Sequence, residues 1–174
     1  MKYRKIILIT SLLSLILMSN YIHGQKKSKE ALGNAIVESI LSNNIDSFKS
    51  LLLPKTVALE LKENRDLENV DKEERDSLMV QFENAYDQKI IPRYEKNFRK
   101  IVNLNEANEI DWSNLNFIIL YKDSSKEEDY IPFFIHSKLS NSDYKHFYFG
   151  AVRYKGEWYL EGQMEITKDE KYAP

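Results

Sequence analysis

Apolar and polar residues alternate from Tyr144 to Ile166, on both sides of the dipeptide Lys155-Gly156. Glycine readily adopts the positive φ of a tight two-residue turn, so the pattern predicts a β-hairpin. In the resulting register Phe149 lies opposite Gly162. A glycine inside a strand has no side chain to pack, so we expect a bend or a bulge at Gly162.

Side chains of a strand point alternately to its two faces, which gives the hairpin one apolar and one polar face. The apolar face carries Phe147, Phe149, Ala151, Trp158, Leu160, Met164 and Ile166. The polar face carries Tyr144, His146, Tyr148, Val152, Tyr154, Tyr159, Glu161, Gln163 and Glu165. An antiparallel sheet of this kind packs its apolar face on the core and presents the other face to water. We therefore expect an exposed surface rich in tyrosine.

The residues before the hairpin have the spacing of helices. Ser28 is a candidate N-cap for a helix that continues to Asn43-Asn44, and a short helix opens at Asp46 and closes at Pro54. Residues 56–61 either extend this short helix or form a separate turn.

A longer helix of about 30 residues is predicted to begin near Asp71. Its apolar stripe recurs at helical spacing: Leu78, Phe82, Tyr86, Ile90, Tyr94, Phe98 and Ile101. Pro92 lies inside this helix and cannot donate a hydrogen bond to the carbonyl oxygen of Gln88, so a kink is expected there. Such a kink would let the helix follow a bent sheet.

Two more strands are expected between the long helix and the hairpin, at residues 116–122 and 130–139. Pro132 places its end of the second strand at a sheet edge or at a bulge, because proline has no N–H to donate. The sequence therefore predicts an α+β fold. In this fold N-terminal helices, including one long kinked helix, pack on a curved four-stranded antiparallel sheet in a cone-like shape.

The first 24 residues have the pattern of a secretory signal peptide. A basic start precedes an apolar run from Ile6 to Met18, which is short for a membrane span, and the small residue Gly24 follows. We expect cleavage after Gly24, a single domain over residues 25–166 and a flexible tail over residues 167–174. An uncleaved anchor is the alternative. The abundance of Lys, Asn, Ile and Glu behind such a leader indicates a bacterial protein that is exported to the periplasm or the exterior.

The net charge excludes some partners. The whole chain has a formal net charge of −2, and loss of Lys2, Arg4 and Lys5 with the leader gives −2 − 3 = −5. A mildly acidic domain lacks the basic surface that binds nucleic acid. The chain has no cysteine, so neither a disulfide bond nor a lipid-bearing cysteine is expected, and the core alone must hold the fold.

The order of elements is helix, short helix, long helix and antiparallel meander, and the last hairpin contains Lys-Gly-Glu-Trp-Tyr-Leu at residues 155–160. This pattern resembles the nuclear transport factor two-like superfamily, also described as cystatin-like or ketosteroid-isomerase-like, in its small exported bacterial forms. The resemblance covers residues 28–166. It implies a pocket between sheet and helices, and a sheet face that often forms dimers or docks partners. Members include isomerases, dehydratases and protein-binding modules, so the fold does not select an activity.

Candidate chemistry is sparse. The sequence contains no phosphate loop, no Gly-x-Ser-x-Gly and no His-Glu-x-x-His. We expect no cofactor and no metal site, because the chain after the leader has only His136 and His146 and no cysteine. These two histidines can face each other on neighbouring strands, which leaves a metal or acid–base pair as the alternative to a structural role.

Three residues are candidates for ligand binding. Tyr86 and Tyr94 lie on the inner stripe of the long helix and can point hydroxyl groups into a pocket, and Arg153 can receive a ligand carboxylate near the hairpin turn. The candidate interaction surface is the polar hairpin face, because Tyr is enriched at interfaces. Its members are Tyr144, His146, Tyr148, Tyr154 and Tyr159. No acid lies on the apolar sheet face, so no catalytic residue is assigned.

The sequence therefore favours an exported, non-catalytic binding or interaction module for an unknown protein or a small apolar ligand, with a homodimer through the sheet face as one arrangement. A small-molecule pocket enzyme of isomerase or hydro-lyase type is the first alternative. An envelope inhibitor or immunity-type protein is the second. A buried carboxylate or histidine beside Tyr86 or Tyr94 in an apolar pocket would favour the enzyme.

Overall fold

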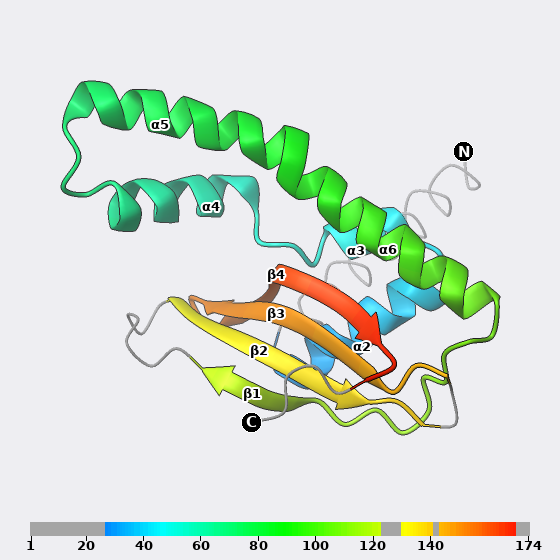
Figure 1. Ribbon diagram of the computed structural model, residues 1–174. Helices are drawn as coiled ribbons and strands as arrows, with labels where there is room; N and C mark the ends of the chain where they lie inside the picture. Colours follow the sequence, from blue (N-terminus) through cyan, green and yellow to red (C-terminus); the bar gives the residue numbers. More distant parts are fainter. Residues whose placement is uncertain (1–26, 123–129, 141–142, 170–174) are drawn as a thin grey trace, which may run out of the picture.

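The structure, a computed structural model, describes residues 27–122, 130–140 and 143–169. Helices and strands follow one another along the chain as Figure 1 shows. The helices are α2 (Lys29–Leu41), α3 (Ile45–Lys49), α4 (Lys55–Leu61), α5 (Lys72–Ala85) and α6 (Ile91–Glu106), with π-helical turns η1 (Lys62–Asp66) and η2 (Tyr86–Ile90). The strands are β1 (Ile118–Lys122), β2 (Tyr130–Lys138), β3 (His146–Tyr154) and β4 (Glu157–Thr167). The predicted signal peptide, residues 1–24, and most of the predicted tail lie outside the described residues.

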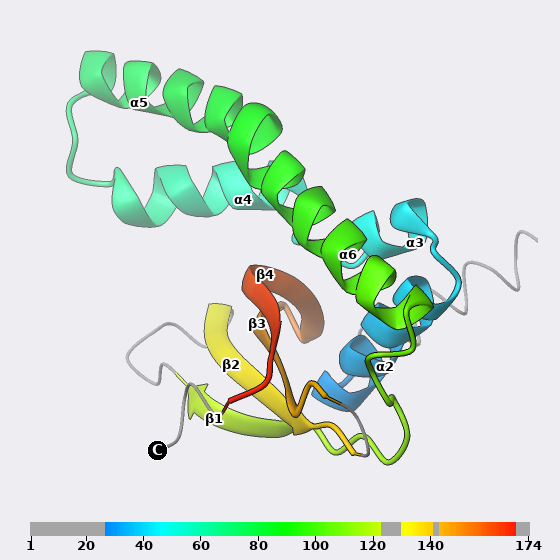
Figure 2. The same cartoon turned by 45° about the vertical axis from the view of Figure 1, so that its right-hand side comes forward.

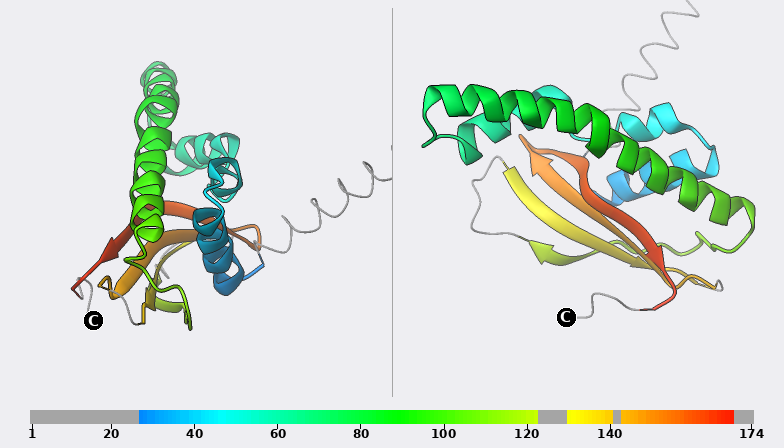
Figure 3. Two further views of the ribbon diagram at one scale, coloured as in Figure 1. Left: turned by 90° about the vertical axis from the view of Figure 1, so that its right-hand side faces the viewer. Right: turned by 45° about the horizontal axis from the view of Figure 1, so that its top comes forward.

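The strands form one antiparallel sheet in the order β1-β2-β3-β4. The sheet is curled but does not close on itself, and α2 and α6 lie over one of its faces (Figure 3). Pro132 of β2 pairs with Val152 of β3. It lies one residue beyond Phe133, which forms the last pair with β1, at Lys122, among the described residues. The predicted α+β class, with a long helix and a four-stranded antiparallel sheet, is confirmed.

The hairpin register follows the prediction from the turn as far as Ala151, which pairs with Leu160. Beyond a bulge, Phe149 pairs with Met164 and not with Gly162. The bulge predicted at Gly162 is therefore confirmed, and this glycine has a φ of +94°. The shift moves the register by an even number of residues, so the side chains of β4 keep their predicted faces.

Gly150 lies opposite the bulge and allows a close approach of the two backbones. A Cβ atom at this position would stand 2.1 Å from the carbonyl oxygen of Glu161. No side chain fits into that space, because the atom in the way belongs to the backbone and cannot rotate aside. The bulge in β4 thus depends on glycine in β3.

The core lies between the sheet and the helices α2, α3 and α6. It receives every residue of the predicted apolar hairpin face: Phe147, Phe149, Ala151, Trp158, Leu160, Met164 and Ile166. Phe98 of α6 is 1% exposed and contacts Phe48 of α3, with ring centroids 4.7 Å apart. Burial of a side chain of this size stabilises the fold by about 1.5–3 kcal/mol.

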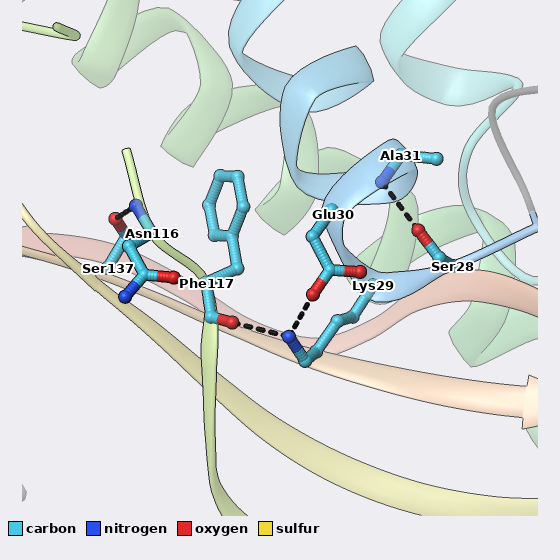
Figure 4. Close-up of polar contacts among 7 residues, drawn as sticks. All are labelled: Ser28, Lys29, Glu30, Ala31, Asn116, Phe117 and Ser137. Carbon is cyan, nitrogen blue, oxygen red and sulfur yellow. Dashed lines mark hydrogen bonds and ion pairs between the residues drawn. The ribbon is translucent and has the colours of Figure 1, made fainter. Parts of the chain in front are cut away.

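The first turn of α2 is tied to the chain that enters β1 (Figure 4). Ser28 Oγ accepts a hydrogen bond from the backbone N–H of Ala31 at 3.1 Å, so Ser28 is the N-cap that the sequence predicted. Lys29 Nζ donates to the carbonyl oxygen of Phe117 at 2.6 Å. The N–H of Asn116 donates to Ser137 Oγ in β2 at 3.0 Å. These bonds satisfy backbone groups just before the β1 ladder begins.

The predicted long helix runs from Lys72 to Glu106 with Asp71 as its N-cap, but it is not uniform. It widens into η2, where the N–H of Ile91 donates to the carbonyl oxygen of Tyr86. Pro92 follows directly, and the helix axis changes direction between α5 and α6 (Figure 2). A wide turn accommodates a residue without an N–H, so the expected kink takes the form of a π-helical turn.

The expectation of an exposed tyrosine surface is wrong. Tyr148 is 1% exposed, Tyr154 7% and Tyr159 9%, and His146 is also buried. Tyr144 is half-buried and packs against the core. The aromatic part of the polar hairpin face is therefore covered, whereas Gln163 of the same face is exposed.

Two kinds of packing involve the buried tyrosines of this face. Near the hairpin turn, Tyr154 and Tyr159 form a second apolar cluster with Leu53 and Val152, and residues of α4 pack against it. Farther along, the ring of Tyr148 stacks on Phe134 and on His136, with centroids 5.7 and 4.6 Å away. The alternation pattern could not foresee the cluster near the turn, because it does not say that α4 crosses to the second face.

Gly150→Ala is expected to destabilise the protein by about 3 kcal/mol or more, because the new Cβ collides with the β4 backbone. Gly156→Ala is the matched control. Gly156 has a φ of +84° but nothing within 4 Å of an added Cβ, so it should lose only about 1 kcal/mol. Urea unfolding followed by circular dichroism measures both changes. Equal losses in the two variants would contradict the close approach at Gly150.

Candidate functional site

The segment Leu51–Leu53, between α3 and α4, pairs with the free edge of β4. The N–H of Leu160 donates to the carbonyl oxygen of Leu51 at 2.8 Å, and the N–H of Leu53 donates to the carbonyl oxygen of Leu160 at 3.2 Å. The result is a short parallel bridge between Leu52 and Leu160. This bridge lies directly before the β4 bulge and places three leucines beside it.

Tyr94 of α6 holds the bulge from the helix side. Its hydroxyl oxygen accepts a hydrogen bond from the backbone N–H of Gly162, a group that the bulge releases from the ladder. Tyr94 is 5% exposed, and burial raises the pKa of its hydroxyl to about 12. Tyr94 is therefore neutral at physiological pH.

Tyr86 of η2 holds the paired segment in the same way. Its hydroxyl donates to the carbonyl oxygen of Leu53 at 2.7 Å. Burial raises the pKa of Tyr86, and the nearby charges of Asp87 and Glu161 act in the same direction. Both tyrosines predicted to face a pocket thus use their hydroxyl groups on the backbone that frames it.

A cavity of about 230 Å³ lies between these elements. Its lining is mainly apolar and comes from the α3–α4 segment, α4, α5, η2, α6 and β4: Leu52, Leu53, Ala58, Phe82, Tyr86, Ile90, Arg93, Tyr94, Leu160, Glu161 and Gly162. A second cavity of about 210 Å³ adjoins it and shares Leu53, Ala58, Phe82 and Glu161. Together we call these two cavities the groove.

The α4–α5 hairpin forms the roof of the groove. It extends past the hairpin end of the sheet (Figure 1), and no residue of α4 or α5 is fully buried. Lys55 of α4 forms ion pairs with Glu83 of α5 and Asp87 of η2, at 3.0 and 2.6 Å. These carboxylates raise the pKa of Lys55, with Asp87 the stronger influence.

Charged groups are unevenly distributed along the groove. In the second cavity, Lys62 pairs with Asp66 at 2.9 Å, and Tyr130 donates to Glu161 at 2.6 Å. Arg93 is the cation of the first cavity and is exposed. It has no ion pair or hydrogen bond with any residue in 27–122, 130–140 or 143–169. The first cavity is therefore lined by a guanidinium group that has no ion pair or hydrogen bond with the described residues.

The structure brings Tyr86 and Tyr94 together in the groove as the sequence predicted, but it does not bring Arg153 there. Arg153 is half-buried and pairs in register with Trp158 near the hairpin turn. Sequence reasoning missed Arg93 and Glu161 as lining residues. The position of Arg93 directly before Tyr94 in the helix, at the margin of its apolar stripe, is the signal that could have indicated it.

His136 and His146 face each other, as the strand positions suggested. Nε2 of His136 lies 3.1 Å from Nδ1 of His146, and both rings are buried. They lie on the opposite sheet face and line neither cavity. In the part of the chain that the structure describes, no group of three or more His, Cys, Asp or Glu residues could hold a metal ion.

No helix within the described ranges is long and apolar enough to cross a membrane. Comparisons of the chain with protein-family models, curated proteins and solved structures found no match. The case for a function therefore rests on the groove. Its apolar walls can take an apolar molecule, and its polar groups at one end can orient it.

Tyr94→Phe is expected to remove one tyrosine that ionises only near pH 12. It should also reduce the loss of unfolding free energy at alkaline pH. The folded protein holds the pKa of Tyr94 at about 12, whereas an unfolded chain has about 10. This difference stabilises the fold in full below pH about 10, and the contribution disappears as the pH rises through about 12. Tyrosinate absorbance against pH and urea unfolding at neutral and alkaline pH measure both effects.

Tyr121→Phe is the control for the unfolding measurements, because Tyr121 is 60% exposed. If Tyr94→Phe leaves the tyrosine ionisation near pH 12 unchanged, the Tyr94 hydroxyl is not buried as described above.

Proposed function

We propose that this protein is an exported, non-catalytic binding domain that takes a small, largely apolar ligand in the groove. The observation that carries the proposal is the cavity of about 230 Å³ with apolar walls from Leu52, Leu53, Phe82, Ile90 and Leu160. Ligand pockets in proteins usually measure about 300–1,000 Å³ and combine apolar walls with few polar groups. The two adjoining cavities together reach the lower part of that range.

The arrangement of hydroxyl groups favours binding over catalysis. An isomerase or hydro-lyase needs a base in the pocket and a donor opposite it that stabilises an oxyanion. Here the Tyr86 proton is given to the carbonyl oxygen of Leu53. Glu161, the carboxylate of the first cavity, is half-buried and accepts from Tyr130. The pocket enzyme remains the alternative, with Glu161 as the base that it would require.

Protein binding is supported less well than ligand binding. The side chains expected to contact a partner or a second copy, among them Tyr148, Tyr154 and Tyr159, are buried. A homodimer or an envelope inhibitor of immunity type would therefore need a different surface from the predicted one. Membership of the nuclear transport factor two-like superfamily stays a prediction that rests on the order of elements.

Ala58→Phe is expected to block the groove, because Ala58 lines both cavities. The neutral fluorophore N-phenyl-1-naphthylamine serves as an apolar probe. It should bind the wild-type protein saturably, and Ala58→Phe should weaken binding about tenfold or more. Thr56→Phe adds the same ring on the exposed side of α4 and should bind like the wild type. Thermal unfolding of each variant checks that the fold is intact.

Two outcomes would contradict ligand binding in the groove. The first is that the wild-type protein gives no saturable fluorescence change. The second is that a folded Ala58→Phe protein binds the probe as well as Thr56→Phe does.

Export is tested separately, by expression of the full sequence in a bacterial host. We expect the mature protein outside the cytoplasm with Gln25 as its first residue. Leu13→Arg puts a charge into the apolar run and should retain the uncleaved chain in the cell. A wild-type protein that stays in the cytoplasm with Met1 intact would contradict the proposal.

A further inference from the structure

Resting on the proposed function, we propose that the ligand is an amphiphile with a carboxylate head and a short apolar tail. Its head lies at Arg93 and Tyr94, and its tail occupies the first cavity. Both residues line that cavity and belong to neighbouring positions of α6. The first cavity therefore combines an exposed guanidinium, a buried hydroxyl group and apolar walls, which is the combination that suits a single-chain amphiphile.

Arg93 is suited to the head because it can bind without giving up an existing partner. Its guanidinium is exposed at the rim and has no ion pair or hydrogen bond with the described part of the chain. By contrast, Lys55 and Lys62 on the roof are held by Asp87 and Asp66. A guanidinium presents parallel N–H groups that match the two oxygens of a carboxylate.

Tyr94 adds a donor inside the cavity. Its oxygen accepts from the N–H of Gly162, and a neutral hydroxyl group still has its own proton to donate. Among the residues that the structure describes, this proton is not donated to any acceptor. Because the bulge holds the ring and the hydroxyl oxygen in place, the donor is preorganised for a ligand oxygen.

Glu161 limits the charge of the head. Its carboxylate also lines the first cavity and lies close enough to Tyr94 to disfavour tyrosinate there. A second negative charge on the ligand would meet this carboxylate with only one guanidinium to offset it. A singly charged carboxylate therefore fits better than a dianionic phosphate, although both are ligands that arginine binds.

The size of the cavity limits the tail. If a methylene group takes up about the volume of a water molecule in the liquid, roughly 30 Å³, the first cavity holds about eight non-hydrogen atoms. Octanoate is accordingly the first compound to test. Each methylene removed from water adds about 0.8 kcal/mol, so shorter carboxylates should bind more weakly in regular steps.

The test is displacement of N-phenyl-1-naphthylamine from the wild-type protein by four compounds with the same tail: octanoate, 1-octanol, octylammonium and octyl phosphate. Octanoate should displace the probe at a concentration at least tenfold lower than 1-octanol. Arg93→Gln should abolish this preference of octanoate over 1-octanol, and Tyr94→Phe should reduce it. Arg99→Gln is the matched control, because Arg99 is exposed on α6 and lines neither cavity.

The outcomes separate this inference from the proposed function. If the probe binds and Ala58→Phe weakens it, but 1-octanol or octylammonium equals octanoate, the carboxylate head is refuted and the groove stands. If octyl phosphate displaces the probe at a lower concentration than octanoate does, the head is a phosphate and the inference is overturned. Equal behaviour of Arg93→Gln and Arg99→Gln also overturns it. If neither the probe nor octanoate, measured directly by calorimetry, binds the wild-type protein, both proposals fail.

Discussion

The pairing of Leu51–Leu53 with Leu160 at the free edge of β4 is the contact on which the rest of this structure depends. An edge strand offers unpaired N–H and C=O groups, and here a segment of the same chain takes them up. Because the segment is attached at the edge, the helix that follows can reach the second face of the sheet. The helices α2, α3 and α6 cover the first face, while α4 covers the hairpin end of the second.

The bulge next to this pairing links the fold to the groove. It requires Gly150, since the carbonyl oxygen of Glu161 occupies the space of a Cβ atom, and it frees the N–H of Gly162 for Tyr94. Regular pairing through this region would use that N–H in the ladder and leave the Tyr94 hydroxyl without its partner. The same backbone distortion therefore satisfies a buried tyrosine and shapes the wall of the cavity.

The two walls of the groove differ in how firmly they are held. On the sheet side, Leu160 and the leucines of the paired segment are buried and joined by backbone hydrogen bonds, and the buried Tyr94 accepts a hydrogen bond from Gly162. The roof consists of α4 and α5, which have no fully buried residue and depend on half-buried contacts and exposed ion pairs. Exposed ion pairs contribute little, so the roof is the part most able to adapt, and a ligand beneath it would add apolar contacts that it lacks.

Local sequence determined the elements of this protein, whereas tertiary contacts decided what their surfaces do. The Ser28 and Asp71 caps, the bulge at Gly162 and the apolar hairpin face follow from spacing and residue type, because they depend on neighbours a few positions away. The burial of Tyr148, Tyr154 and Tyr159 does not, and neither does the meeting of Arg93 with Tyr94 and Glu161 around one cavity. The attachment of Leu51–Leu53 to β4 places Leu53 and α4 against Tyr154 and Tyr159, and it puts Leu52 and Leu53 in the cavity wall. It is a contact between segments about a hundred residues apart that no local pattern records.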